Sequence, residues 1–128
     1  MVMLDIDHFK RINDQYGHPA GDGVLSLFGR FLRANVRVED VVGRLGGEEF
    51  GILLAGTGPE EARMLIERLL ERFSNIPHLA RGGLRFYVTF SAGVAVLEPG
   101  EGSDSWRQRA DDACYAAKRA GRSRVEAA

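Results

Sequence analysis

Acidic side chains stand at two places where the sequence changes character. Asp5 and Asp7 end a short apolar run at the start of the chain, and Glu48 and Glu49 follow a pair of glycines. If the two segments are neighbouring strands, Asp5 and the glutamates converge, and such hard oxygen ligands suit Mg²⁺. The glutamates could equally be solvated turn residues. Carboxylates that end a buried strand are harder to dismiss, because they are costly unless they are paired or bind a metal.

Groups that could bind phosphate occur near both ends of the chain. Phe9 and Lys10 follow the first acids at the predicted start of a helix, where free backbone N–H groups form an anion site. Far downstream, a basic cluster surrounds the predicted end of the last helix; it comprises Lys118, Arg119, Arg122 and Arg124. These cations either complement the helix dipole or reach a triphosphate.

Asn13 and Asp22 flank a segment that contains Gly17, Pro19 and Gly21. An amide and a carboxylate together can satisfy the donor and acceptor edge of a guanine base. On spacing alone they could as easily be turn and helix-cap residues. The sequence therefore leaves both interpretations open for this pair.

The elements that must position these groups follow from hydrophobic periodicity. Residues 1–7 are predicted to form a buried strand, with Asp5 and Asp7 on one face and Ile6 on the other. Residues 9–16 are predicted to form a short helix and Gly17–Gly21 a turn. Longer helices are expected at 22–36 and 59–73, separated by strands at 41–45 and 50–55 that form a tight hairpin through Gly46 and Gly47.

The last third of the chain predicts the rest of a sheet. Residues 84–97 are expected to form one long strand or two, with Gly93 as a bulge. Ser103 or Asp104 would cap a last helix that ends at Gly121, and Val125 begins a short edge strand. The resulting order, β-α-α-β-β-α-β-α-β, predicts an α+β domain rather than a doubly wound one.

Composition excludes several classes of protein. The chain has 128 residues, the size of one domain, with 17 Lys plus Arg against 18 Asp plus Glu, so we expect no DNA or RNA partner. Its single cysteine, Cys114, excludes an internal disulfide framework. No apolar run approaches the roughly 20 residues of a membrane span and no signal-peptide pattern is present, so we expect a cytoplasmic segment without membrane contact. The longer protein from which this segment comes can still be tethered to a membrane through other segments.

The chemistry-bearing residues also form a recognisable series of motifs. The five residues 46–50 read Gly-Gly-Glu-Glu-Phe, and they are joined by the segments 5–14, 16–18 with 21–22, 91–94, and 110–118. In order and spacing, these motifs resemble the GGDEF family of diguanylate cyclases, in its GGEEF variant, over essentially the whole chain. The resemblance implies a central, mainly antiparallel sheet flanked by helices, similar to nucleotidyl cyclases and polymerase palms, with a ferredoxin-like core.

The resemblance implies an activity and a metal site. The family condenses two GTP molecules into cyclic di-GMP and two pyrophosphates, with two domains meeting in an antiparallel homodimer. Asp5, the backbone carbonyl of Ile6, and Glu48 would hold Mg²⁺, with Mn²⁺ as an alternative. Glu49 would be a further metal ligand or would help to activate the 3′-hydroxyl, and which glutamate is the base stays open.

The resemblance also implies how GTP is bound. Gly46 and Gly47 would let the turn pass close to the nucleotide. Asn13 and Asp22 would bind guanine. The phosphates would be bound by the backbone amides of Phe9 and Lys10 and by the side chains of Lys118 and Arg122.

A second motif indicates regulation. Arg37 and Asp40 match the family's RxxD inhibitory site, and five residues separate Asp40 from Gly46. An arginine fork can grip a guanine edge or a phosphate, and the resemblance adds Arg68 as a contact from a partner domain. An exposed, salt-bridged stretch is the alternative explanation. With the GGEEF motif beside it, we favour product feedback inhibition by cyclic di-GMP.

Residues 1–128 lack the helix and loop that usually open a GGDEF domain, so we expect a fragment of a longer protein whose parent is an active cyclase. Whether the fragment turns over GTP stays open. The alternative is a non-catalytic module that binds GTP or cyclic di-GMP as a receptor. A third reading is a class III nucleotide cyclase or a polymerase palm, and the predicted guanine pair and RxxD site argue against it.

Overall fold

The computed structural model describes all 128 residues. In chain order the elements are β1 (Val2–Ile6), α1 (Phe9–Tyr16), α2 (His18–Ala34), β2 (Val41–Gly46), β3 (Glu49–Leu53), α3 (Pro59–Ser74), β4 (His78–Leu79), the 3₁₀ turn η1 (Arg81–Gly83), β5 (Arg85–Phe86), β6 (Phe90–Val94), α4 (Ser103–Arg119) and β7 (Val125–Ala127). None of the helices combines the length and hydropathy needed to cross a bilayer.

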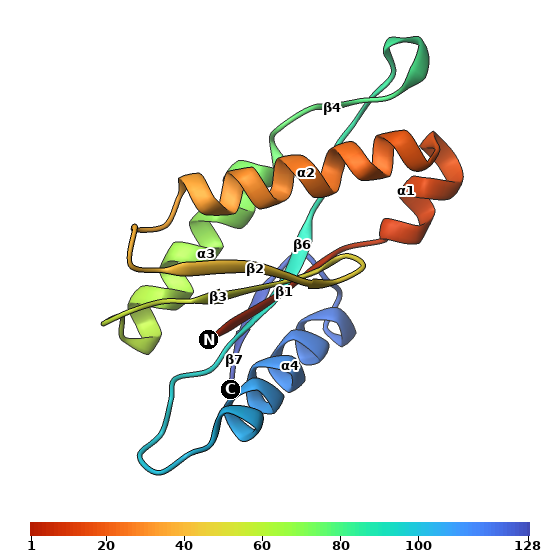
Figure 1. Cartoon of the computed structure of the whole chain (residues 1–128). Helices are drawn as coiled ribbons and strands as arrows, with labels where there is room; N and C mark the ends of the chain where they lie inside the picture. The colour runs from red at the N-terminus through yellow and green to blue at the C-terminus, as the bar shows by residue number, and fades with distance from the viewer.

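Five strands form the central sheet in the order β2-β3-β1-β6-β7. Neighbouring strands are antiparallel except for β6 and β7, which are parallel. Helices α2 and α3 lie on one side of this sheet and α4 on the other (Figure 1). The first four sheet strands and their connections follow the β-α-β-β-α-β pattern of ferredoxin-like folds, so the predicted α+β architecture is confirmed.

The alternation of β1 places its residues in two different layers. Val2, Leu4 and Ile6 are buried in the main core together with the apolar faces of α2 and α3, whereas Met3 belongs to a smaller cluster with residues of α4. Asp5 is on the same face of β1 as Met3. The sequence pattern of this strand therefore turns its first acid toward α4.

The start of α2 differs from the prediction. The helix begins at His18 rather than at residue 22. Pro19 fits in its first turn, because the N–H group that proline lacks would have no hydrogen-bond partner there. Only Gly17, with φ at 90°, forms the turn from α1. Gly21 is instead a helical residue packed against Asn13, whose Oδ1 would lie 1.8 Å from a Cβ built at this position.

The predicted segment 84–97 divides into β5 and β6, and the short β4 pairs with β5 in a separate two-stranded sheet that the sequence did not predict. Gly93 is not a bulge, because its register with β1 is continuous; the irregularity of the sheet lies between Arg44 and Gly46. Gly93 lies against the backbone of α4. That helix is preceded by Gly102, so the capping role predicted for Ser103 or Asp104 was wrong.

Candidate active site

The predicted acidic groups meet at one end of the sheet. Asp5 on β1 is directly opposite Glu49 on β3, and the Ile6 backbone N–H donates to the carbonyl of Glu48 at 3.2 Å. The turn between β2 and β3 includes Gly47, whose φ of 42° lies in the left-handed region that glycine adopts without cost. Arg44 donates from Nε to the Gly47 carbonyl at 2.9 Å and so supports this turn.

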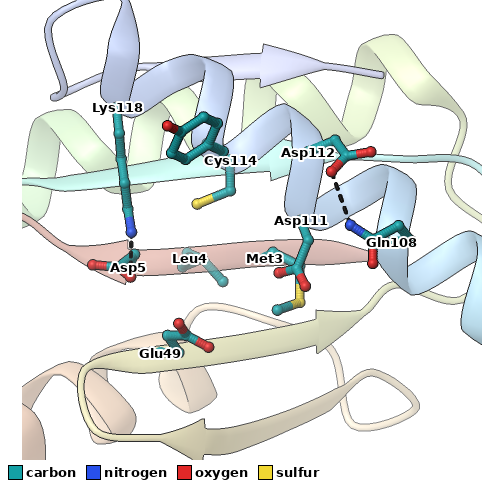
Figure 2. Close-up of a pocket in the computed structure, with 10 residues that line it drawn as sticks. Met3, Leu4, Asp5, Glu49, Gln108, Asp111, Asp112, Cys114 and Lys118 are labelled. Carbon is teal, nitrogen blue, oxygen red and sulfur yellow. Dashed lines mark hydrogen bonds and ion pairs between the residues drawn. The ribbon is translucent and has the colours of Figure 1, made fainter.

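Asp5 also contacts the last helix. Its Oδ2 accepts a hydrogen bond from Lys118 Nζ at 2.6 Å, and Figure 2 shows this lysine reaching down from α4. Burial raises the pKa of Asp5; the hydrogen bond and charge of Lys118 oppose this, and the charges of Glu48 and Glu49 add to it. Burial alone would lower the pKa of Lys118, but the contact with Asp5 raises it overall. The lysine therefore stays charged beside a carboxylate that has lost much of its hydration.

A cleft of about 260 Å³ opens beside these groups. Asp5 and Glu49 form one wall, and residues of α4 form the other, including Asp111, Tyr115 and Lys118 (Figure 2). The side chains of two strands and one helix thus face a common space. Four carboxylates line this cleft, and its one cation, Lys118, is bonded to Asp5.

These carboxylates fit a magnesium site that is completed by substrate. No group of three or more acidic, histidine or cysteine side chains is arranged to hold an ion unaided. Mg²⁺ is usually bound through one or two carboxylates together with water and substrate phosphates, which is the number that Asp5 and Glu49 supply at their paired position. The donor set is therefore suited to an ion that arrives with a nucleotide.

The predicted phosphate ligands come from two segments. Helix α1 begins at Phe9 without a side-chain cap, so its first amides are free to donate to an anion. The residue before it, His8, has a left-handed backbone with φ at 55°. Arg122 lies in the turn after α4, four positions beyond Lys118.

The predicted guanine ligands lie on α1 and α2. The Oδ1 atom of Asn13 is buried without a hydrogen-bond partner. This oxygen packs against Gly21, so the unpaired acceptor is covered by protein. Asp22 is exposed and lines a separate groove with Arg30, Arg33 and Arg44.

The RxxD residues are not part of this cluster. They precede β2, whose far end carries Gly46, so the length of the strand, roughly 17 Å, separates the two sites. Asp40 is a buried acceptor: it binds the backbone N–H groups of Arg37 at 2.8 Å and Ala55 at 2.9 Å. The Arg37 guanidinium is half exposed and contacts Thr57 Oγ1 at 3.0 Å, and Arg68 is exposed on α3.

Sequence reasoning missed two supporting residues. Arg44 supports the glycine turn, but no sequence pattern indicates this role, because an arginine on a strand has many uses. Asp7 was singled out only as the second acid of the first strand, but its carboxylate binds Thr89 and Ser91, which lie more than 80 positions away. The Asp-x-Asp spacing signalled that Asp7 mattered without indicating its partners.

Comparison with known proteins supports the resemblance to GGDEF domains that the motifs indicate. The family model described as diguanylate cyclase, GGDEF domain, matches residues 1–124. Diguanylate cyclase DgcP of Pseudomonas aeruginosa is 46% identical over 128 residues, which is 100% of this chain and 19% of that protein. The probable diguanylate cyclase DgcC of Escherichia coli K12 is 40% identical over 131 residues, which is 100% of this chain and 34% of that protein.

A solved structure extends the likeness to three dimensions. The GGDEF domain of DgcB from Caulobacter crescentus, in complex with c-di-GMP, superposes with a TM-score of 0.95 at 34% identity, covering 98% of this chain and 75% of that one. The chain spans about a fifth and a third of the lengths of the two curated relatives. Because the family model matches nearly every residue and the fold agrees, this chain belongs to the GGDEF domain family of diguanylate cyclases.

Proposed function

We propose that this chain is a diguanylate cyclase domain that condenses two GTP molecules into cyclic di-GMP and two pyrophosphates. The observation that carries the proposal is the pairing of Asp5 with Glu49 across β1 and β3, with Lys118 bonded to Asp5 in the same cleft. Attack of a 3′-hydroxyl on an α-phosphorus needs carboxylates for a metal and cations for the departing phosphates, and both are present there.

The residues of this chain divide that work among themselves. Asn13, a half-buried amide packed against Gly21, binds guanine together with the exposed Asp22. The first amides of α1, at Phe9 and Lys10, hold phosphate oxygens, and the side chains of Lys118 and Arg122 add positive charge. Holding the reacting groups in place supplies a large part of the rate acceleration in reactions of this kind.

Asp5, the carbonyl of Ile6, and Glu48 are the proposed ligands of Mg²⁺, with Glu49 as a further ligand or as the group that takes the proton of the 3′-hydroxyl. When bound, the ion would stabilise the negative charge on the entering and leaving oxygens. Glu48 lies where its backbone already joins β1, which keeps the glycine turn close to Asp5. Gly46 and Gly47 carry no side chain that could keep the nucleotide away from this turn.

One chain holds one GTP, so the reaction needs a second copy with its own GTP facing the first. An antiparallel homodimer places each 3′-hydroxyl against the other molecule's α-phosphate. The total rate of cyclic di-GMP formation should therefore fall more steeply than in proportion to protein concentration when the protein is diluted.

The test begins by removing any cyclic di-GMP bound to the purified chain. The chain is then incubated with GTP and Mg²⁺, and the nucleotides are separated by chromatography. Glu48→Gln should reduce turnover by at least about a hundredfold, because it removes a carboxylate ligand of the ion that would stabilise charge at the reacting phosphate. Glu71→Gln, an exposed acid on α3, is the matched control and should leave turnover unchanged. Full activity in Glu48→Gln would refute the assignment of this glutamate.

We also propose that cyclic di-GMP inhibits the domain through Arg37, Asp40 and Arg68. The support is a loop held in place by Asp40, which presents the guanidinium of Arg37 to solvent. Arg37→Ala should weaken cyclic di-GMP binding about 10- to 100-fold, the value of one or two charge-assisted hydrogen bonds, and should leave catalysis intact. The control is Arg85→Ala on β5. Inhibition that is equally strong in Arg37→Ala would reject the site.

The same loop favours a second candidate function. Because it is organised without any contribution from the catalytic cleft, the chain could bind cyclic di-GMP as a receptor without turning over GTP. Binding of cyclic di-GMP with no product from GTP, in a preparation that is dimeric, would favour this receptor role over the cyclase.

A further inference from the structure

Asp7 is a buried carboxylate that the proposed reaction leaves without a task. It is 5% exposed, and its oxygens accept three hydrogen bonds. Thr89 Oγ1 donates to Oδ2 at 2.6 Å, Ser91 Oγ to Oδ1 at 2.6 Å, and the backbone N–H of Ser123 to Oδ2 at 3.0 Å. The carboxylate therefore joins the end of β1 to the start of β6 and to the turn after α4.

That turn has an unusual backbone. Gly121, Arg122 and Ser123 have consecutive positive φ angles of 124°, 64° and 47°. Glycine adopts such a conformation freely, but the other two residues adopt it at a cost and keep it only when their surroundings hold them. Four hydrogen bonds hold this turn. The N–H groups of Gly121 and Arg122 donate to the carbonyls of Lys118 at 3.3 Å and Ala117 at 3.0 Å, and Arg124 Nε donates to the Arg122 carbonyl at 3.2 Å. The fourth, from the Ser123 N–H to Asp7, joins the turn to the end of β1.

The contact also fixes where the turn lies. Asp7 is followed at once by His8, another left-handed residue, and by the first turn of α1. The bond from Ser123 to Asp7 therefore places the turn that carries Arg122 beside the N-terminus of α1. These are the two segments that the proposed function assigns to the phosphates.

We propose that Asp7 is a positioning residue, which holds the turn of residues 121–123 in its left-handed conformation and so keeps Arg122 beside the start of α1 for the triphosphate of GTP. This inference rests on the proposed function. It divides the Asp-x-Asp pair between two tasks: Asp5 faces the cleft with Glu49 and Lys118, while Asp7 binds only hydroxyl and amide donors.

The test is the affinity for α,β-methylene-GTP with Mg²⁺, measured by titration calorimetry on the whole chain. Asp7→Ala leaves the Ser123 N–H without its acceptor, and the affinity should fall at least about tenfold. The affinity of Asp7→Asn for the analogue should lie within about threefold of the wild-type affinity. Its amide oxygen can still accept from the Ser123 N–H, and the hydroxyl of Ser91 can turn to accept from the amide NH₂. Loss in Asp7→Asn equal to that in Asp7→Ala would mean that the charge itself is needed, as for a metal ligand, and would overturn the inference.

Two readouts separate positioning from a general loss of structure. Affinity for GMP, which carries one phosphate, should change much less than affinity for the triphosphate analogue in Asp7→Ala. Binding of cyclic di-GMP at Arg37, at the other end of β2, should not change. Equal losses for GMP and the analogue, or an unchanged affinity for the analogue, would each overturn the inference.

A second variant covers the case in which Asp7→Ala does not fold. Thr89→Val/Ser91→Ala removes both hydroxyl groups that donate to Asp7 but keeps the carboxylate itself. This double variant should weaken binding of the analogue several-fold. Unchanged binding would overturn the inference. A wild-type chain that binds no GTP analogue would overturn the proposed function and this inference with it. A wild-type chain that binds the analogue no better than Asp7→Ala would overturn the inference alone.

Discussion

Replacing Gly93 by alanine should push the last helix off the sheet. A Cβ at this position would lie 2.2 Å from the Cys114 backbone nitrogen, 2.3 Å from the Ala110 carbonyl oxygen and 2.7 Å from the Ala113 carbonyl carbon. All three are backbone atoms of α4, so no side chain can rotate away to make room. Reaching an ordinary contact of about 3.5 Å would require α4 to move by about 1 Å.

The expected loss of stability follows from that displacement. Overpacking of a core commonly costs about 1–3 kcal/mol, and an obstacle made of helix backbone puts Gly93→Ala at the upper end, about 3 kcal/mol. For 128 residues the unfolding entropy is about 0.27 kcal/mol/K, so Tm should fall by about 11 °C. Because α4 also carries Lys118, bonded to Asp5 at 2.6 Å, GTP turnover should fall as well.

Urea unfolding followed by circular dichroism measures this effect directly. Gly23→Ala is the matched control, because Gly23 is a helical residue of α2 with nothing within 4 Å of a built Cβ. That substitution should raise the free energy of unfolding by about 0.5–1 kcal/mol. If Gly93→Ala is as stable as wild type, the close approach of α4 to β6 is wrong, and the positions of Lys118 and Arg122 derived from it are wrong too.

Two further outcomes concern buried titratable groups. Burial between Phe73 and Phe86 lowers the pKa of His78, so this contribution to stability is fully present above the ordinary pKa of 6.5 and is lost as the pH falls below it. His78→Phe should flatten the fall in the urea midpoint between about pH 7 and pH 5, and an unchanged slope would show that other groups cause it. Burial also raises the pKa of Cys114 from 9.0 to about 12, which lowers the thiolate fraction at pH 8 by roughly a thousandfold. A disulfide reagent should therefore label this thiol rapidly in urea and very slowly in the folded protein, and equally fast labelling would contradict its burial.

Features of this protein that depend on local pattern could be predicted from its sequence. Helices α3 and α4 form where hydrophobic periodicity predicted helices, and each buries one apolar face, because helical spacing brings such residues together whatever that face meets. The alternation of β1 and the glycine pair between β2 and β3 were enough to predict that Asp5 and the glutamates converge if their strands are neighbours, and Asp5 does pair with Glu49. The tight hairpin limits the register of β2 with β3, whereas the pairing of β3 with β1, which brings Glu49 opposite Asp5, joins segments far apart in the chain.

Other features arise from contacts between residues far apart in the chain, which no local pattern indicates. Nothing near Gly93 in the sequence indicates that α4 passes over it, so a position that looked like a bulge is a contact with a helix backbone. The start of α2 also escaped prediction, since Gly21 is needed for Asn13 rather than for a turn. Asp7 is the clearest case: its partner Ser123 lies 116 positions away, and only the folded sheet brings the carboxylate to that amide. Local pattern specifies which face a side chain takes, whereas packing of distant segments specifies what it meets there.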